Sequence, residues 1–214
     1  MSQGVDDVLG VEGEWLDTSV LRIPADRMKV HDLTMPLDLG RRFDLALSLE
    51  VGEHLPASAA PELVRTLTRL APVIAFSAAA PLQGGTHHLN ERWPEYWAGL
   101  FAGHGFVPVD SLRPRFWLDE HVAWYYRQNM FLAVHPTALE RYPILSSEHA
   151  RAGGRVLPLV HPDRYLRIAP SSLTRLKDDA LGALYERWPA ARSARSSVAG
   201  RIAASMAESS RSPN

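Results

Sequence analysis

The chain has 214 residues and contains no cysteine. This length is enough for one domain with a substantial core, and the missing thiols exclude disulfides, thiolate metal sites and a cysteine nucleophile. The formal net charge is −1, which argues against bulk electrostatic binding of nucleic acid. No stretch approaches the roughly 20 apolar residues that cross a bilayer, and the acidic N-terminus does not resemble a signal peptide. We therefore expect a cytoplasmic protein without a membrane partner.

The first half of the chain is predicted to combine short strands with one helix. Short apolar runs bounded by turn signals are predicted strands at residues 8–12, 28–32, 43–48 and 73–77. Such runs are typical of strands buried on both faces of a parallel sheet. Apolar residues recur at helical spacing at Leu63, Val64, Leu67 and Leu70. We predict Ser58 as the N-cap of this helix, with Pro61 in its first turn.

The second half continues the alternation as far as about residue 141. Aromatic and aliphatic residues at helical spacing predict a helix that Asn90 caps, with Pro94 in its first turn and Gly103 and Gly105 closing it. Strand-like segments follow at residues 107–111 and 130–134. A last helix is predicted at residues 171–188, and residues 192–214, rich in serine, alanine and arginine, are expected to be mobile or loosely helical.

Strands that alternate with helices predict an α/β fold, Rossmann-like, with a mostly parallel sheet and flanking helices. Ligands of such sheets bind outside the carboxyl ends of the strands, where this sequence places Glu12, Asp32 and Glu50. A carboxylate at such a strand end can accept both hydroxyls of a ribose, and Asp32 could accept from the exocyclic amino group of adenine. The alternative interpretation is that these acids are solvated or cap helices.

Five stretches carry motifs in a recognisable order. They are VLGVEG at residues 8–13, HDL at 31–33, FDLALSLEVGEHL at 43–55, FSAAAPLQGGTHHLNERWPEYW at 76–97 and WYYRQN at 124–129. In order and spacing they resemble class I S-adenosylmethionine-dependent methyltransferases of the bacterial small-molecule type, over roughly residues 5–165. We accordingly expect a methyltransferase-like domain at residues 1–165, a C-terminal helix at 166–190 and a flexible tail at 191–214.

The resemblance implies S-adenosyl-L-methionine as the cofactor and assigns residues to it. In the family, the acid of the second motif, here Glu12 followed by Gly13, holds the ribose. The acid of the third motif, here Asp32, and the next residue, Leu33, flank the adenine. The stretch after the fourth strand, here Leu49 and Glu50, completes the expected cofactor-binding residues.

The sequence departs from the family at its first motif, a strand followed by a Gly-x-Gly-x-Gly loop, to which nothing here corresponds. In the family that strand lies between the strands matched by residues 8–12 and 43–48. We consider three explanations: the native chain starts upstream, the two flanking strands pair directly, or another chain supplies the strand. Upstream extension is favoured as the origin of the truncated sequence, and direct pairing is predicted for this chain, because each buried orphan backbone group costs about 1–3 kcal/mol.

Two adjacent histidines, His87 and His88, lie in a loop with a glycine pair after the fourth strand, where substrate should enter. Histidine is the simplest base near neutral pH, so we predict His88 first and His87 second as catalytic residues. The alternative is that one caps the next helix and the other is exposed. His54 is interpreted as starting the next helix and packing against the loop. Adjacent histidines point in different directions, so we predict no metal site.

Two functions stay open. The first is methyl transfer to an oxygen or nitrogen of a small metabolite, which requires that the cofactor bind. The second is a truncated, non-catalytic protein of the same fold that acts as a binding or assembly module. A nicotinamide-dependent oxidoreductase would need a Gly-x-Gly-x-x-Gly loop after a strand, and the sequence has none. A small-molecule substrate is expected as the partner, and the formation of a homo-oligomer is left open.

Overall fold

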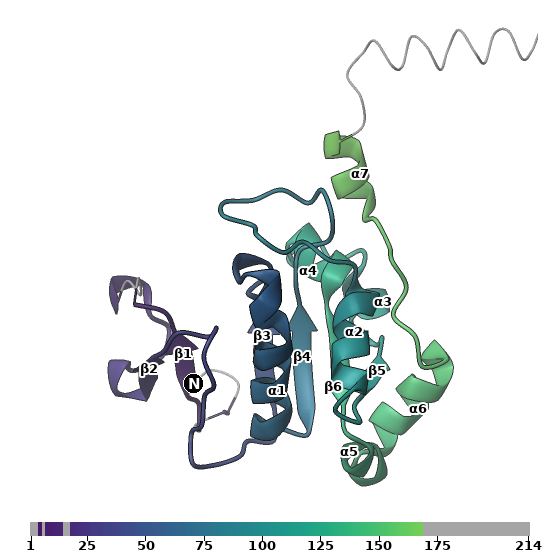
Figure 1. Ribbon diagram of the computed structural model, residues 1–214. Coiled ribbons are helices and arrows are strands. Elements are labelled where there is room, and N and C mark those ends of the chain that lie inside the picture. The colour runs from purple at the N-terminus through teal and green to yellow at the C-terminus, as the bar shows by residue number, and fades with distance from the viewer. Residues whose placement is uncertain (1–3, 6, 15–17, 169–214) are drawn as a thin grey trace, which may run out of the picture. The chain divides into compact units, whose positions relative to one another are not determined.

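The computed structural model describes residues 4–5, 7–14 and 18–168 (Figure 1). The strands are β1 (Gly10–Glu12), β2 (Met28–Val30), β3 (Ala46–Leu49), β4 (Val73–Ser77), β5 (Val107–Val109) and β6 (Phe131–Val134). The α-helices are α1 (Ala60–Leu70), α2 (Pro94–Ala102), α3 (Leu112–Phe116), α4 (Trp124–Asn129), α5 (Pro136–Arg141), α6 (Pro143–Ala152) and α7 (Pro162–Ile168). The 3-10 helices are η1 (Thr18–Val20), η2 (Ala25–Arg27), η3 (Gly52–His54) and η4 (Ala57–Ala59). All elements up to α6 belong to one compact unit, Met1–Tyr165.

The strands form two sheets. β1 and β2 make a parallel pair, and the other four strands make a sheet in the order β3-β4-β6-β5. Within this second sheet β3 is parallel to β4, while β6 is antiparallel to both β4 and β5. Three of its four strands therefore run in one direction. The predicted α/β fold with flanking helices is confirmed.

The prediction that the strands around residues 8–12 and 43–48 pair directly is wrong. β1 pairs with β2, and β3 forms an edge of the other sheet. Neighbouring parallel strands are joined by a crossover, usually a helix, but turns at Asp32 and Asp38 occupy the connection from β2 to β3. Leu45, just before β3, and Leu47, within it, are 49% and 64% exposed, so this edge carries apolar side chains in contact with solvent.

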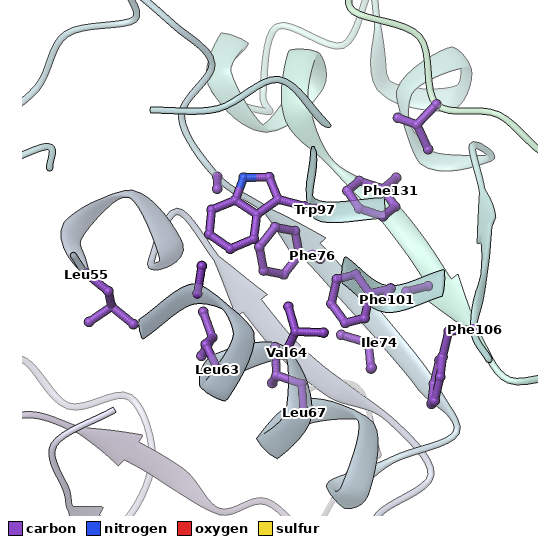
Figure 2. Close-up of a cluster of buried hydrophobic side chains, with 14 of the residues drawn as sticks. Leu55, Leu63, Val64, Leu67, Ile74, Phe76, Trp97, Phe101, Phe106 and Phe131 are labelled. Carbon is purple, nitrogen blue, oxygen red and sulfur yellow. The ribbon is translucent and has the colours of Figure 1, made fainter. Parts of the chain in front are cut away.

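One face of the four-stranded sheet carries the larger core cluster, under α1 and α2 (Figure 2). α1 contributes Leu63, Val64 and Leu67, which lie toward Ile74 and Phe76 of β4 in Figure 2. α2 contributes Trp97 and Phe101, whose ring centroids lie 5.0 and 5.3 Å from that of Phe76. Burial of such aromatic side chains supplies a large share of core stabilisation, so α2 is held to β4 mainly by these rings.

The opposite face of the sheet carries a second, smaller cluster. Along β4 the residues of the two clusters alternate, because successive side chains of a strand point to opposite faces. Its buried members are Val73, Ala75, Val109, Leu132, Val134 and Ala138. Residues of α3, α5 and α6 pack against it, among them Leu112, Leu139 and Leu145. Helices therefore cover both faces, as an α/β sheet requires.

The predicted N-caps are both wrong, although the predicted helices exist. Ser58 lies inside η4, and Ala59 precedes α1. Asn90 lies outside α2, which begins at Pro94 after an extended Trp93. At α2 the reason is that Trp93 precedes a proline, which disfavours the helical conformation at that residue, and at α1 the 3-10 turn η4 takes up the position of Ser58. The predicted helix at residues 171–188 and the predicted tail lie outside the described residues. In the part of the chain that is described, no helix is both long and apolar enough to cross a bilayer.

Candidate active site

The carboxyl ends of β3 and β4 meet at Glu50. This residue directly follows β3 and adopts a left-handed backbone conformation, with φ of 54°. Its backbone N–H donates to both the carbonyl oxygen and the Oγ of Ser77, the last residue of β4, each at 3.0 Å. A non-glycine residue in this region costs about 1–3 kcal/mol and persists only where its surroundings impose it. The two bonds from Glu50 to Ser77 impose it here.

The Glu50 side chain belongs to a buried polar network. Gln83 donates to Oε2 of Glu50 at 2.8 Å, and Asn129, at the end of α4, donates to Oε1 at 3.3 Å. The Nδ2 of Asn129 also donates to Oε1 of Gln83 at 2.8 Å. Gln128 then donates to Oδ1 of Asn129 at 3.0 Å. Such networks rigidify a site when their members are satisfied, so the position of the Glu50 carboxylate is fixed from two elements.

The segment after β3 is tied to the loop that follows β4. The carbonyl oxygen of Glu53 accepts the N–H of Leu89 at 2.7 Å and that of Asn90 at 3.0 Å. One residue earlier, Gly52 lies under the indole of Trp97, and a Cβ there would come within 2.7 Å of the ring. These contacts place η3 between the α2 core and the loop, so Glu53 and His54 are held beside the loop histidines.

The Glu53 side chain is a buried acid. It is 0% exposed, and neither carboxylate oxygen has a hydrogen-bond partner among the described residues. Burial, together with the nearby negative charge of Glu50, outweighs the opposing effect of the backbone N–H groups of Glu53 and Ala79 and raises the pKa of Glu53 to about 8. Burial, followed by the charges of Tyr125, Glu50 and Glu53, also raises the pKa of Tyr126 on α4. The site is therefore short of positive charge.

His88 is oriented by an acid of its own loop. Its Nδ1 lies 2.9 Å from Oε1 of Glu91, and the same carboxylate accepts the N–H groups of Leu82 and Gly84, each at 2.8 Å. Burial acts to raise the pKa of Glu91, but hydrogen bonds from His88, Gly84 and Leu82 outweigh it and lower that pKa. With Nδ1 engaged, the Nε2 of His88 is the nitrogen left for chemistry.

The structure brings His88, His54 and Glu53 together. The rings of His54 and His88 meet edge to face with centroids 4.9 Å apart. His54 packs against the loop as predicted, but it lies in η3, before α1 begins. His87, the other predicted catalytic residue, is exposed and has a left-handed backbone with φ of 58°. Of the two loop histidines, His88 is therefore the one that joins the acids at the carboxyl edge of the sheet.

The other predicted cofactor residues follow the strands of the two-stranded sheet or line the core. Glu12 accepts the N–H of Gly13 through Oε1 at 2.8 Å. Asp32 is exposed and accepts both the N–H and the hydroxyl of Thr34 through Oδ1, which lowers its pKa. Leu33 packs against the larger core cluster, and Leu49 against the smaller one. Glu12 and Asp32 thus belong to one sheet and Glu50 to the other.

Four polar residues of the site were missed by reasoning from the sequence: Glu53, Gln83, Glu91 and Asn129. Glu91 could have been found from the sequence, because an acid three residues after His88 is close enough along the chain to contact it. Gln83 and Asn129 are separated by 46 positions along the chain, and no local pattern links them. Glu53 stands beside His54 within a motif, and only the fold reveals that its carboxylate is buried.

No protein-family model matches this chain, and no curated protein sequence matches it. A solved structure that it resembles in part is the magnesium protoporphyrin IX methyltransferase (ChlM) from Synechocystis PCC 6803 with bound SAH. The two chains are 18% identical over the aligned part, with a TM-score of 0.34. The similarity covers 50% of this chain and 50% of that chain, so this chain spans about half the length of the protein it matches.

Proposed function

We propose that the chain belongs to a methyltransferase that moves a methyl group from S-adenosyl-L-methionine to an oxygen or nitrogen of a small metabolite. The observation that carries this proposal is Glu50, which is fixed at the carboxyl end of β3 by Ser77 and by the polar network around it. Ligands of α/β sheets bind at this edge. The residues around Glu50 also carry the most specific part of the resemblance noted in the sequence.

The cofactor supplies an activated methyl group, so the chain has to bind, orient and deprotonate. In this proposal Glu12, with Gly13 behind it, accepts the ribose hydroxyls, while Asp32 and Leu33 flank the adenine. Leu49 and Glu50 border the reacting end. His88 takes the proton of the acceptor at Nε2, because Glu91 engages Nδ1, and His87 is the second candidate for this role.

A second function is favoured by one specific observation. Glu12 and Asp32 follow strands of the two-stranded sheet, whereas Glu50 follows a strand of the four-stranded sheet. Residues that bind one cofactor have to be held at fixed distances, and no backbone ladder joins these two sheets among the described residues. The alternative is therefore a non-catalytic protein of this fold that serves as a binding or assembly module.

Calorimetric titration of S-adenosylhomocysteine into the 214-residue chain distinguishes the two functions. Methyl transfer predicts saturable binding in the micromolar range that Glu12→Ala and Glu50→Gln both weaken at least about 10-fold, since each removes a charge-assisted hydrogen bond. Glu140→Ala, an exposed acid on α5, is the matched control and should bind like the original chain. Absence of binding by the folded chain, or equal binding by all variants, would refute the proposal and favour the module.

A further inference from the structure

Three side chains with metal-ligand chemistry converge where η3 meets the loop before α2. One ligand atom from each of Glu53, His54 and His88 lies within 4.8 Å of the others. Two imidazoles and a carboxylate are a protein ligand set of catalytic zinc sites, which keep a further position for water or substrate. We propose that Glu53, His54 and His88 bind a divalent transition-metal cation of the zinc class.

The first support is the state of the Glu53 carboxylate. Buried polar groups in proteins are almost always paired, yet both oxygens of this 0% exposed residue have no hydrogen-bond partner among the described residues. Glu50 adds a second negative charge close by. A buried carboxylate without a donor is costly unless a cation or a proton compensates it. A bound metal ion supplies that compensation through the same two oxygens.

The second support is the orientation of His88. Histidines that bind metals almost always give their other ring nitrogen to a carboxylate, a carbonyl or water. The Nδ1 of His88 meets Oε1 of Glu91 at 2.9 Å in this manner. At the other nitrogen, a Cβ on Gly85 would lie 2.3 Å from Nε2. Glycine at position 85 therefore lets the imidazole of His88 pack closely against the loop backbone.

The third support is that little movement is needed to complete the site. Metal–ligand distances of about 2.0–2.2 Å place the ligand atoms of a tetrahedral site about 3.3 Å apart. The exposed His54 can rotate, so the separations within 4.8 Å can close without a change of backbone. The chain has no cysteine, so nitrogen and oxygen donors have no competition from thiolates, which suits a borderline cation.

A cation at this site and the proposed methyl transfer would both use the Nε2 of His88. In a metal-bound chain His88 would act as a ligand in place of a base, and the chemistry that such a cation would supply is Lewis acidity. The metal site rests on the cluster alone and holds whether or not the chain transfers methyl groups. Binding of zinc and binding of S-adenosylhomocysteine are therefore separate measurements.

The test is calorimetric titration of Zn²⁺ into the full 214-residue chain after treatment with EDTA. We expect one saturable site per chain in the micromolar range or tighter. His54→Ala, His88→Ala and Glu53→Gln should each weaken binding at least about 10-fold, and Glu91→Gln about 10–100-fold through the orientation of His88. Zinc should also raise the melting temperature of the original chain and not that of the His54→Ala variant.

Two exposed histidines outside the cluster, His104 and His121, provide matched controls. His104→Ala and His121→Ala should bind zinc like the original chain. The exposed position of His54 means that its variant should fold even where His88→Ala does not, which circular dichroism checks. The proposal is overturned by a folded chain that shows no saturable zinc binding, by a His54→Ala variant that binds as the original does, or by equal losses in the control variants.

Discussion

Replacing Glu53 with glutamine should stabilise the metal-free chain above about pH 8. The folded-state pKa of Glu53 is about 8 against an ordinary value of 4.5, chiefly because the carboxyl is buried. The folded chain therefore holds a proton that the unfolded chain releases. This contribution to stability is fully present below the unfolded pKa and is lost as the pH rises through the folded pKa. Glutamine is neutral at every pH and avoids that loss.

The size of the effect is large for one side chain. The difference between the pKa values of 4.5 and about 8 corresponds to an upper limit of about 5 kcal/mol, at about 1.36 kcal/mol per pH unit. The titratable groups around Glu53 are Glu50 at the end of β3, His54 on η3, His88 on the loop and Tyr126 on α4.

Urea denaturation in EDTA at pH 6 and pH 9 measures this prediction. The original chain should lose up to about 3 kcal/mol of unfolding free energy between the two pH values, and Glu53→Gln should lose much less. At pH 6 the original chain should already be about 2 kcal/mol less favoured than Glu53→Gln, because its unfolded state ionises above a pKa of 4.5, and this difference should grow until about pH 8. Glu140→Gln, at an exposed position on α5, should follow the original chain. Identical pH dependence in the original and Glu53→Gln chains would show that Glu53 stays ionised when folded.

Local sequence patterns predicted which helices and strands exist better than they predicted the helix caps or the pairing of the strands. The strand at residues 73–77 has the predicted bounds. A short, continuous apolar run between turns is typical of a strand that is buried on both faces, so both of its ends can be seen in the sequence. Asn90 failed as an N-cap because Pro94 forces Trp93 to be extended. The Asn90 side chain is instead buried, and its Oδ1 accepts from Arg92 at 3.0 Å. A capping residue three positions too early has no helix to cap.

The pairing of the strands and the burial of Glu53 could not be predicted from the sequence, for a different reason. Pairing depends on the connection between strands, and the segment from β2 to β3 gives no periodic signal. The burial of Glu53 depends on a carbonyl that accepts two loop N–H groups and on a neighbouring glycine beneath Trp97. Each of these contacts joins segments more than 30 positions apart. The histidine at position 88 was predicted because its chemistry is visible in its side chain alone.

Truncation of Trp97 should produce the largest loss of stability outside the acid cluster. The side chain is 1% exposed and packs on Phe76, with ring centroids 5.0 Å apart. Replacing a buried tryptophan with alanine costs about 3–5 kcal/mol, through lost transfer free energy and the cavity that remains. Denaturant unfolding of Trp97→Ala should show this loss. Trp93→Ala, at a site 38% exposed, should cost much less.

The same tryptophan should also couple the core to the acid cluster through Gly52. A Cβ at Gly52 would meet the Trp97 ring at 2.7 Å, so Gly52→Ala alone should cost about 1–3 kcal/mol by overpacking. In the Trp97→Ala background the added methyl group enters the cavity, so the double variant should be more stable than the sum of the two losses. Denaturant unfolding of all four proteins gives this interaction energy, and additive losses would contradict the contact. Because Gly52 begins η3, the coupling would mean that packing under α2 sets the position of Glu53 and His54.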